Sequence, residues 1–181
     1  MESQPFLERY QELVVGAVGF AGIIATLWAN ARAGRAQHSF ERDTEAEGLR
    51  RALIEELCLV RESFESRATS LREAGTTGHD ALIPFERMTD VYQRSIERLG
   101  LLRHNEITAL LRAYVLLMQM PDKLAIMAGA AARPSGGYIR IPTHLMEACA
   151  EMHRTHAEPV EAAINALRAG SAAYVRKYPQ A

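Results

Sequence analysis

Residues 13–31 form the longest stretch of the chain without a charged side chain, LVVGAVGFAGIIATLWANA. At a helical rise of about 1.5 Å per residue the stretch covers about 28 Å, close to the hydrocarbon thickness of a bilayer. A helix also satisfies all of its own backbone hydrogen bonds in lipid. Tyr10 and Trp28 lie near its two ends, where membrane helices carry interfacial aromatic residues. The pattern predicts one transmembrane helix over residues 13–31.

Two other interpretations of this stretch stay open. A helix that is apolar all round also fits the core of a soluble protein, although this length is unusual for a chain of 181 residues. A cleaved signal peptide fits the small residues Ala29 and Ala31 around Asn30. However, residues 1–12 carry three Glu and one Arg, whereas a signal peptide begins with net positive charge. We therefore favour a retained anchor.

Basic residues on the two sides of the stretch predict its orientation. Arg9 alone precedes it, whereas arginines follow it at positions 32, 35, 42, 50 and 51. Because Lys and Arg accumulate on the cytoplasmic side of a membrane, we expect the N-terminus outside and the larger C-terminal part in the cytoplasm. The layout resembles that of small single-pass proteins of the bacterial inner (plasma) membrane.

Small residues recur on one face of the predicted span. Alanine occupies every fourth position and a glycine lies close to the same face: Ala17, Ala21, Gly22, Ala25 and Ala29. Small side chains let two membrane helices approach closely, although such residues are also common in membrane helices generally. This face is a candidate contact for a second copy of the chain or for another membrane protein.

The rest of the chain carries helical periodicity. Residues 32–48 are polar and rich in Ala, Arg and Glu, which predicts a helical stalk. From residue 49 an apolar stripe follows at steps of three and four: Leu49, Leu53, Leu57, Val60, Phe64, Ala68 and Leu71. Charged residues between these positions are expected to form a solvated face: Arg50, Arg51, Glu55, Glu56, Arg61, Glu62, Glu65 and Arg67.

Further helices are predicted from residue 84 or 85 to 99, from a cap at Asn105 to 120 with a continuation to about 132, and from about 142 to 168. Glycines are expected to stop the first and last of them, at Gly100 and Gly170. Prolines are expected to kink or break helices at Pro121 and Pro159. Residues 133–137 predict a loop.

Two short extended segments, residues 82–83 and 138–141, can pair as a minimal β-ribbon, because each precedes a proline that favours extended backbone. Prolines that simply begin helices explain the same pattern, and we favour that explanation. The prediction is an all-α protein with a short tail (1–12), a transmembrane helix (13–31), a stalk (32–48) and a cytoplasmic bundle of about four or five helices (49–181).

The best metal-like set is Cys149, His153 and His156, because spacings of four and three place all three on one helix face. A thiolate and two imidazoles are suitable ligands for zinc or iron. A fourth ligand would have to come from elsewhere, and the sequence does not mark one. We therefore predict no metal and no cofactor, and keep a metal- or ligand-binding helical module as the alternative.

Composition and motifs reduce the number of functions that the sequence allows. The net charge of −1 offers no field that would attract nucleic acid. Cys58 and Cys149 are expected to be reduced and buried. A phosphate-binding loop and a nucleophile elbow are both absent from the sequence. The sequence predicts a non-enzymatic, membrane-anchored interaction or accessory subunit, which binds partners through its transmembrane helix, its cytoplasmic helical domain or both.

Overall fold

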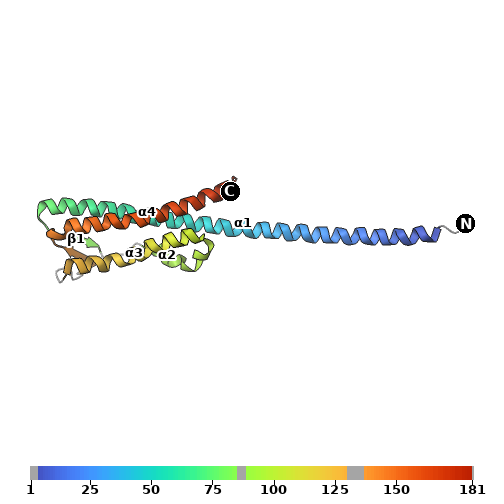
Figure 1. Cartoon of the computed structure of the whole chain (residues 1–181), viewed down its shortest axis with the longest axis horizontal. Coiled ribbons are helices and arrows are strands. Elements are labelled where there is room, and N and C mark those ends of the chain that lie inside the picture. The colour runs from blue at the N-terminus through green and yellow to red at the C-terminus, as the bar shows by residue number, and fades with distance from the viewer. Residues whose placement is uncertain (1–3, 85–88, 130–136, 181) are drawn as a thin grey trace. The chain divides into compact units, whose positions relative to one another are not determined.

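A computed structural model describes residues 4–84, 89–129 and 137–180 (Figure 1). The chain divides into two compact units, Met1–Thr44 and Glu45–Ala181. Helices dominate the described residues, which confirms the predicted all-α class. In chain order the elements are α1 (Gln4–Thr77), β1 (Ala81–Pro84), α2 (Asp90–Ser95), η1 (Ile96–Leu101), α3 (His104–Ala128), β2 (Tyr138–Ile141), η3 (Thr143–Leu145) and α4 (Met146–Lys177).

The core of the second unit lies between the C-terminal part of α1 and the helices α3 and α4, which lie along it in Figure 1. The predicted apolar stripe of α1 is buried at every position, as its three- and four-residue spacing requires. The other two helices contribute stripes of the same spacing: Leu110, Ala113, Tyr114 and Leu117 from α3, and Val160, Ala163, Ile164 and Leu167 from α4.

A two-stranded ribbon closes one end of this unit. β1 pairs antiparallel with β2, with Ala81 opposite Ile141 and Pro84 opposite Tyr138. Ile139 and Ile141 are fully buried, whereas the intervening Arg140 is exposed, as a period of two demands. The predicted ribbon is therefore correct, and our preference for prolines that only begin helices was wrong.

Asp80 holds the end of the ribbon. Its carboxylate accepts hydrogen bonds from Arg140 Nε at 2.7 Å and from the backbone N–H of Thr143 at 3.3 Å. The hydrogen bond from Arg140 is the main reason that the pKa of Asp80 lies below its usual value. This single side chain links the segment before β1 to the segment that follows β2.

Several helix ends differ from the predictions. α2 begins at Asp90 and passes directly into η1, which includes Gly100. The predicted start of this helix falls partly on residues 85–88, which lie outside the described residues. So do residues 130–132 of the predicted helical continuation and residues 133–136 of the predicted loop. α3 begins at His104 rather than after a cap at Asn105, because the backbone N–H of Arg103 donates to the Glu106 side chain at 2.6 Å.

Neither proline interrupts its helix. α3 continues through Pro121 to Ala128, and α4 continues through Pro159 to Lys177. A proline removes only one helical hydrogen bond, and packing against neighbouring helices can offset that loss. Gly170 does not stop α4 either; it is buried inside the helix, which continues to Lys177.

Candidate functional site

The apolar segment of α1 is uncovered in the structure. Every residue from 15 to 33 is exposed. Its large apolar side chains are between 50% and 67% exposed: Val15, Val18, Phe20, Ile23, Ile24, Leu27 and Trp28. α1 is one helix that is long and apolar enough to cross a membrane, and none of its most apolar window is buried. A core helix of a soluble protein would show the opposite.

The one hydroxyl of this segment is satisfied locally. Thr26 Oγ1 donates to the carbonyl of Gly22 at 2.9 Å, so the side chain makes its hydrogen bond within its own helix. The predicted packing face is also open: Ala17, Ala21, Gly22, Ala25 and Ala29 are all exposed. A Cβ added at Gly22 would meet nothing within 4 Å. A second helix has room to approach this face.

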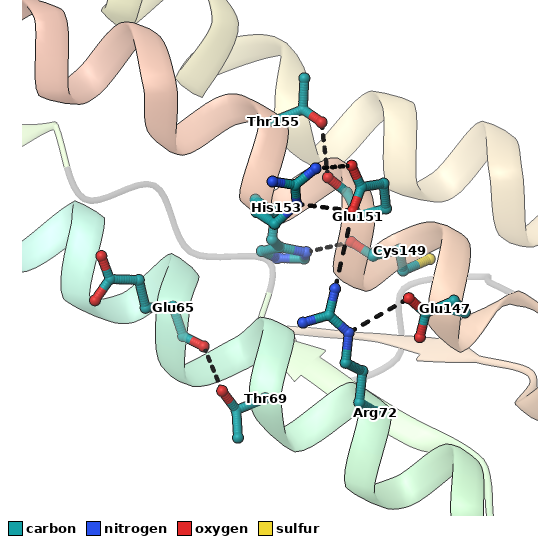
Figure 2. Close-up of polar contacts among 9 residues, drawn as sticks. Glu65, Thr69, Arg72, Glu147, Cys149, Glu151, His153 and Thr155 are labelled. Atoms are coloured by element: carbon teal, nitrogen blue, oxygen red, sulfur yellow. Dashed lines mark hydrogen bonds and ion pairs between the residues drawn. The ribbon is translucent and has the colours of Figure 1, made fainter.

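The predicted metal-like set lies on α4, but its two rings bond to backbone carbonyls; Figure 2 shows the bond between His153 and Cys149. His153 Nδ1–H donates to the carbonyl of Cys149, and His156 Nδ1–H donates to the carbonyl of Met152, each at 2.8 Å. Lys123 Nζ of α3 donates to the other ring nitrogen of His156 at 3.2 Å. Within residues 4–84, 89–129 and 137–180, no group of three His, Cys, Asp or Glu side chains is arranged to hold a metal ion.

Burial determines the charge states of this set. It raises the pKa of the Cys149 thiol, which therefore stays protonated, and it lowers the pKa of both imidazoles. His153 is fully buried, its ring packs edge-on against Phe64 at 5.4 Å, and its Nε2 has no hydrogen-bond partner. The two rings thus join α4 to α1 and α3 as neutral groups, and metal binding by this set stays an untested alternative.

His153 makes the stability of the second unit dependent on pH. The unfolded chain binds a proton at about pH 6.5, whereas the buried ring binds it only at lower pH. The contribution of His153 to the free energy of unfolding is therefore fully present above about pH 6.5. It is lost as the pH falls through the folded-state pKa, and the free energy then changes by at most about 1.4 kcal/mol per pH unit.

We expect His153→Phe to reduce this slope of unfolding free energy against pH, measured by urea unfolding at pH 5 to 7. Substituting the exposed His144 with Gln should leave it unchanged; equal slopes in all three proteins would contradict the assignment.

Glu56 is a polar residue of the core that the sequence analysis placed on a solvated face. It is only 8% exposed, and its carboxylate accepts from the backbone N–H groups of Val91 at 2.6 Å and Tyr92 at 3.1 Å. The hydroxyl of Tyr114 donates to the same carboxylate, and its ring stacks on Tyr92 at 3.8 Å. Desolvation, followed by the Glu56 hydrogen bond, raises the pKa of Tyr114. Glu56 thus fastens the N-terminus of α2 to α1 and α3.

A second buried cluster joins α1, α3 and α4. Arg50 donates through Nε and Nη2 to the two carboxylate oxygens of Glu106, at 2.8 and 3.2 Å. Glu106 is fully buried and Arg50 is 5% exposed, so the solvated-face prediction was also wrong for Arg50. Glu47 lies 3.8 Å from the other side of the guanidinium. The pair lies directly against Gly170 of α4, where a side chain would overlap the Glu106 carboxylate.

The spacing of residues in the sequence does indicate both buried clusters. Glu56 lies three residues after Leu53 and four before Val60, so it falls within the apolar stripe of α1. Glu106 likewise precedes Leu110 by four residues. Helical spacing places such residues on the buried face, where a carboxylate needs several donors. Both carboxylates are structural, because their hydrogen bonds go to the chain's own backbone and side chains.

Exposed and partly exposed ion pairs connect α1 to α4 along the surface. Figure 2 shows Arg72 pointing at Glu147 and Glu151. The nitrogen–oxygen distances of these two pairs are 3.3 and 3.8 Å, and Arg61 donates to Glu161 at 2.7 Å. Such pairs contribute little stability, typically below about 1 kcal/mol each. They fix which face of α4 meets α1 without creating a reactive site.

A groove of about 530 Å³ lies between the start of α3 and the middle of α4. Its charged and imidazole side chains are His104, Arg112 and Glu158. All three side chains are exposed to solvent. A smaller apolar cavity of about 40 Å³ lies between α1 and α3, beside Phe64 and Pro121.

The two cysteines do not form a disulfide. Cys149 is buried, as predicted, whereas Cys58 is partly exposed.

Among the described residues, the uncovered apolar segment of α1 is the feature that most needs a partner. Compared with protein-family models, curated proteins and solved structures, the chain matches none of them.

Proposed function

We propose that the protein is a non-enzymatic, single-pass membrane subunit, in which α1 anchors a helical domain to the bilayer and contacts a partner. One observation carries this proposal: the apolar segment of α1 at residues 15–31 is exposed around its whole circumference. Contiguous apolar surface of this size is not stable in water and needs lipid or another protein to cover it. The excess of arginine after the segment supports an N-terminus outside and a cytoplasmic domain in a plasma membrane.

Lipid is a better cover than protein for most of this surface. Each Leu, Ile, Phe or Val near the centre of a membrane helix favours insertion by about 0.3 to 0.6 kcal/mol. The segment contains no Asp, Glu, Lys or Arg to oppose them. The absence of charge all round the helix fits lipid, whereas a helix that binds only a protein groove keeps a polar face.

The small-residue face supports a second role for the same helix. Ala17, Ala21, Ala25 and Ala29 lie on one side, and larger apolar residues such as Phe20 and Ile23 lie elsewhere around the helix. In lipid, close packing of backbones is a main source of helix association. The partner is a second copy of the chain or another membrane protein with a similar face.

Substitution of the small residues tests this contact. We expect the change Ala21→Leu with Ala25→Leu to abolish association in mild detergent, measured by pull-down of the full chain followed by mass spectrometry. The larger side chains would hold the two backbones apart. The control is Gly19→Leu, which adds bulk on the opposite side and should leave association intact. Unchanged association after both alanine substitutions would rule out this face.

A further inference from the structure

Two arginines follow the apolar segment of α1 at its C-terminal end. The guanidinium carbon of Arg32 lies 5.5 Å from the centre of the Trp28 ring, a cation–π distance. Arg35 Nε donates to the carbonyl of Ala31 at 3.1 Å, so its side chain lies back along the helix toward the apolar segment. Both arginines are exposed. The Arg32 cation is therefore held at Trp28, and the Arg35 cation is turned toward the same end of the apolar segment.

These cations have no acidic neighbour close in sequence. The first carboxylate after Arg35 is Glu41, about 9 Å further along the helix axis. Its carboxylate is contacted instead by Gln37 at 3.0 Å and His38 at 3.6 Å. Among the described residues, neither Arg32 nor Arg35 forms an ion pair. Both guanidinium groups are therefore available to an anion from outside the chain.

We propose that Arg32 and Arg35 bind the phosphate groups of anionic lipids in the leaflet on the C-terminal side of the span. This inference rests on the proposed membrane span. Tryptophan prefers the headgroup level, and Trp28 would place both guanidinium groups there. A guanidinium can donate two parallel hydrogen bonds to a phosphate, which makes arginine a good ligand for such headgroups. An anionic lipid also brings a net negative charge that offsets the adjacent positive charges of Arg32 and Arg35, whereas a zwitterionic lipid brings no net charge.

Trp28 is the only tryptophan of the chain, so its fluorescence reports on this level alone. The full chain is placed in vesicles of phosphatidylcholine with a minority of phosphatidylglycerol, and one lipid at a time carries a nitroxide quencher high on its acyl chain. The ratio of quenching by the two lipids measures enrichment of the anionic lipid beside Trp28. We expect enrichment of about fivefold for each arginine that contributes, decreasing at high salt.

Matched variants locate the effect. Arg35→Gln should lower the enrichment about fivefold, and a second change, Arg32→Gln, should remove it. Arg42→Gln loses the same charge about 10 Å beyond Arg35 along the helix and should leave enrichment unchanged. Equal losses in the Arg35 and Arg42 variants would overturn the inference, because a diffuse charge effect would then explain the enrichment.

The failure of this inference is distinguishable from the failure of the span. Equal quenching by both lipids in the unmodified protein would contradict headgroup binding and leave the span intact. Enrichment that persists in the double arginine variant would show that other groups, such as a second copy of the chain, recruit the lipid. Absence of quenching by either lipid would overturn both the span and the lipid site.

Discussion

Gly170→Ala is expected to destabilise the Glu45–Ala181 unit by about 3 kcal/mol or more, although alanine is normally the better helix former. A Cβ at this position would overlap a carboxylate oxygen of Glu106 and lie 2.6 Å from Nε of Arg50. Neither group can simply move into solvent, because both are buried. Breaking a buried ion pair typically costs about 3 to 5 kcal/mol, since each partner is left without its counter-charge.

The matched control for this prediction is Gly48→Ala. Gly48 is also inside a helix, but it is exposed and an added Cβ would meet nothing within 4 Å. Propensity alone should then stabilise the protein, by about 0.5 to 1 kcal/mol. Urea unfolding of the full chain in mild detergent, followed by circular dichroism, compares the two. A Gly170→Ala protein as stable as the unmodified chain would show that the buried pair does not depend on this glycine.

The second large effect is expected from charges placed in the apolar segment of α1. Phe20→Arg combined with Ile23→Arg should move the protein from the membrane pellet to the soluble fraction. Each arginine near the centre of a membrane helix opposes insertion by about 2.5 to 3.5 kcal/mol. Two of them outweigh the favourable contributions of the remaining apolar residues, which amount to only a few tenths of a kcal/mol each.

The control for this change adds the same two charges outside the segment. Gln37→Arg combined with Ser39→Arg lies on the polar side, where both residues are exposed. We expect this protein to remain in the membrane pellet after high-speed centrifugation, because arginine there agrees with the predicted orientation. If the Phe20 and Ile23 double variant pelleted with membranes as completely as the control, residues 13–31 would not lie in the hydrocarbon layer.

Helical spacing was the most informative pattern in the sequence. It identified the buried stripe of α1 from Leu49 to Leu71, because apolar residues at steps of three and four can share a core only as one helix face. Leu110 and Tyr114 of α3, which lie four residues apart, are also fully buried. These features depend only on local periodicity, which is present in the chain itself.

Polar residues in the core were not predicted, because their partners are distant in sequence. Glu56 is satisfied by backbone and hydroxyl groups 35 to 58 residues away, and Arg50 meets Glu106 across 56 residues. Charged residues were assigned to the surface by their type, although their spacing placed these two on the buried face. Spacing is therefore a better guide than charge at such positions.

Gly170 was misinterpreted for a similar reason. Glycine often ends a helix, but here it falls three residues after Leu167 and four before Tyr174, within the buried stripe of α4. Its missing side chain makes room for Glu106, a residue 64 positions earlier in the chain. The order of residues shows the gap in the stripe, but only the folded chain shows what fills it. Pro121 and Pro159 were also misinterpreted, because packing against other helices outweighs the local tendency of proline to break a helix.

The position of the two chain ends relative to a sealed membrane tests the central claim most directly. A tag is placed at each terminus of the full chain, and a protease is added to sealed, inverted plasma-membrane vesicles, whose cytoplasmic face is outside. If α1 spans the bilayer as proposed, the C-terminal tag is digested and the N-terminal tag survives until detergent opens the vesicles. Digestion of both tags before detergent is added would contradict the span, because the whole chain would then lie on one side of the membrane.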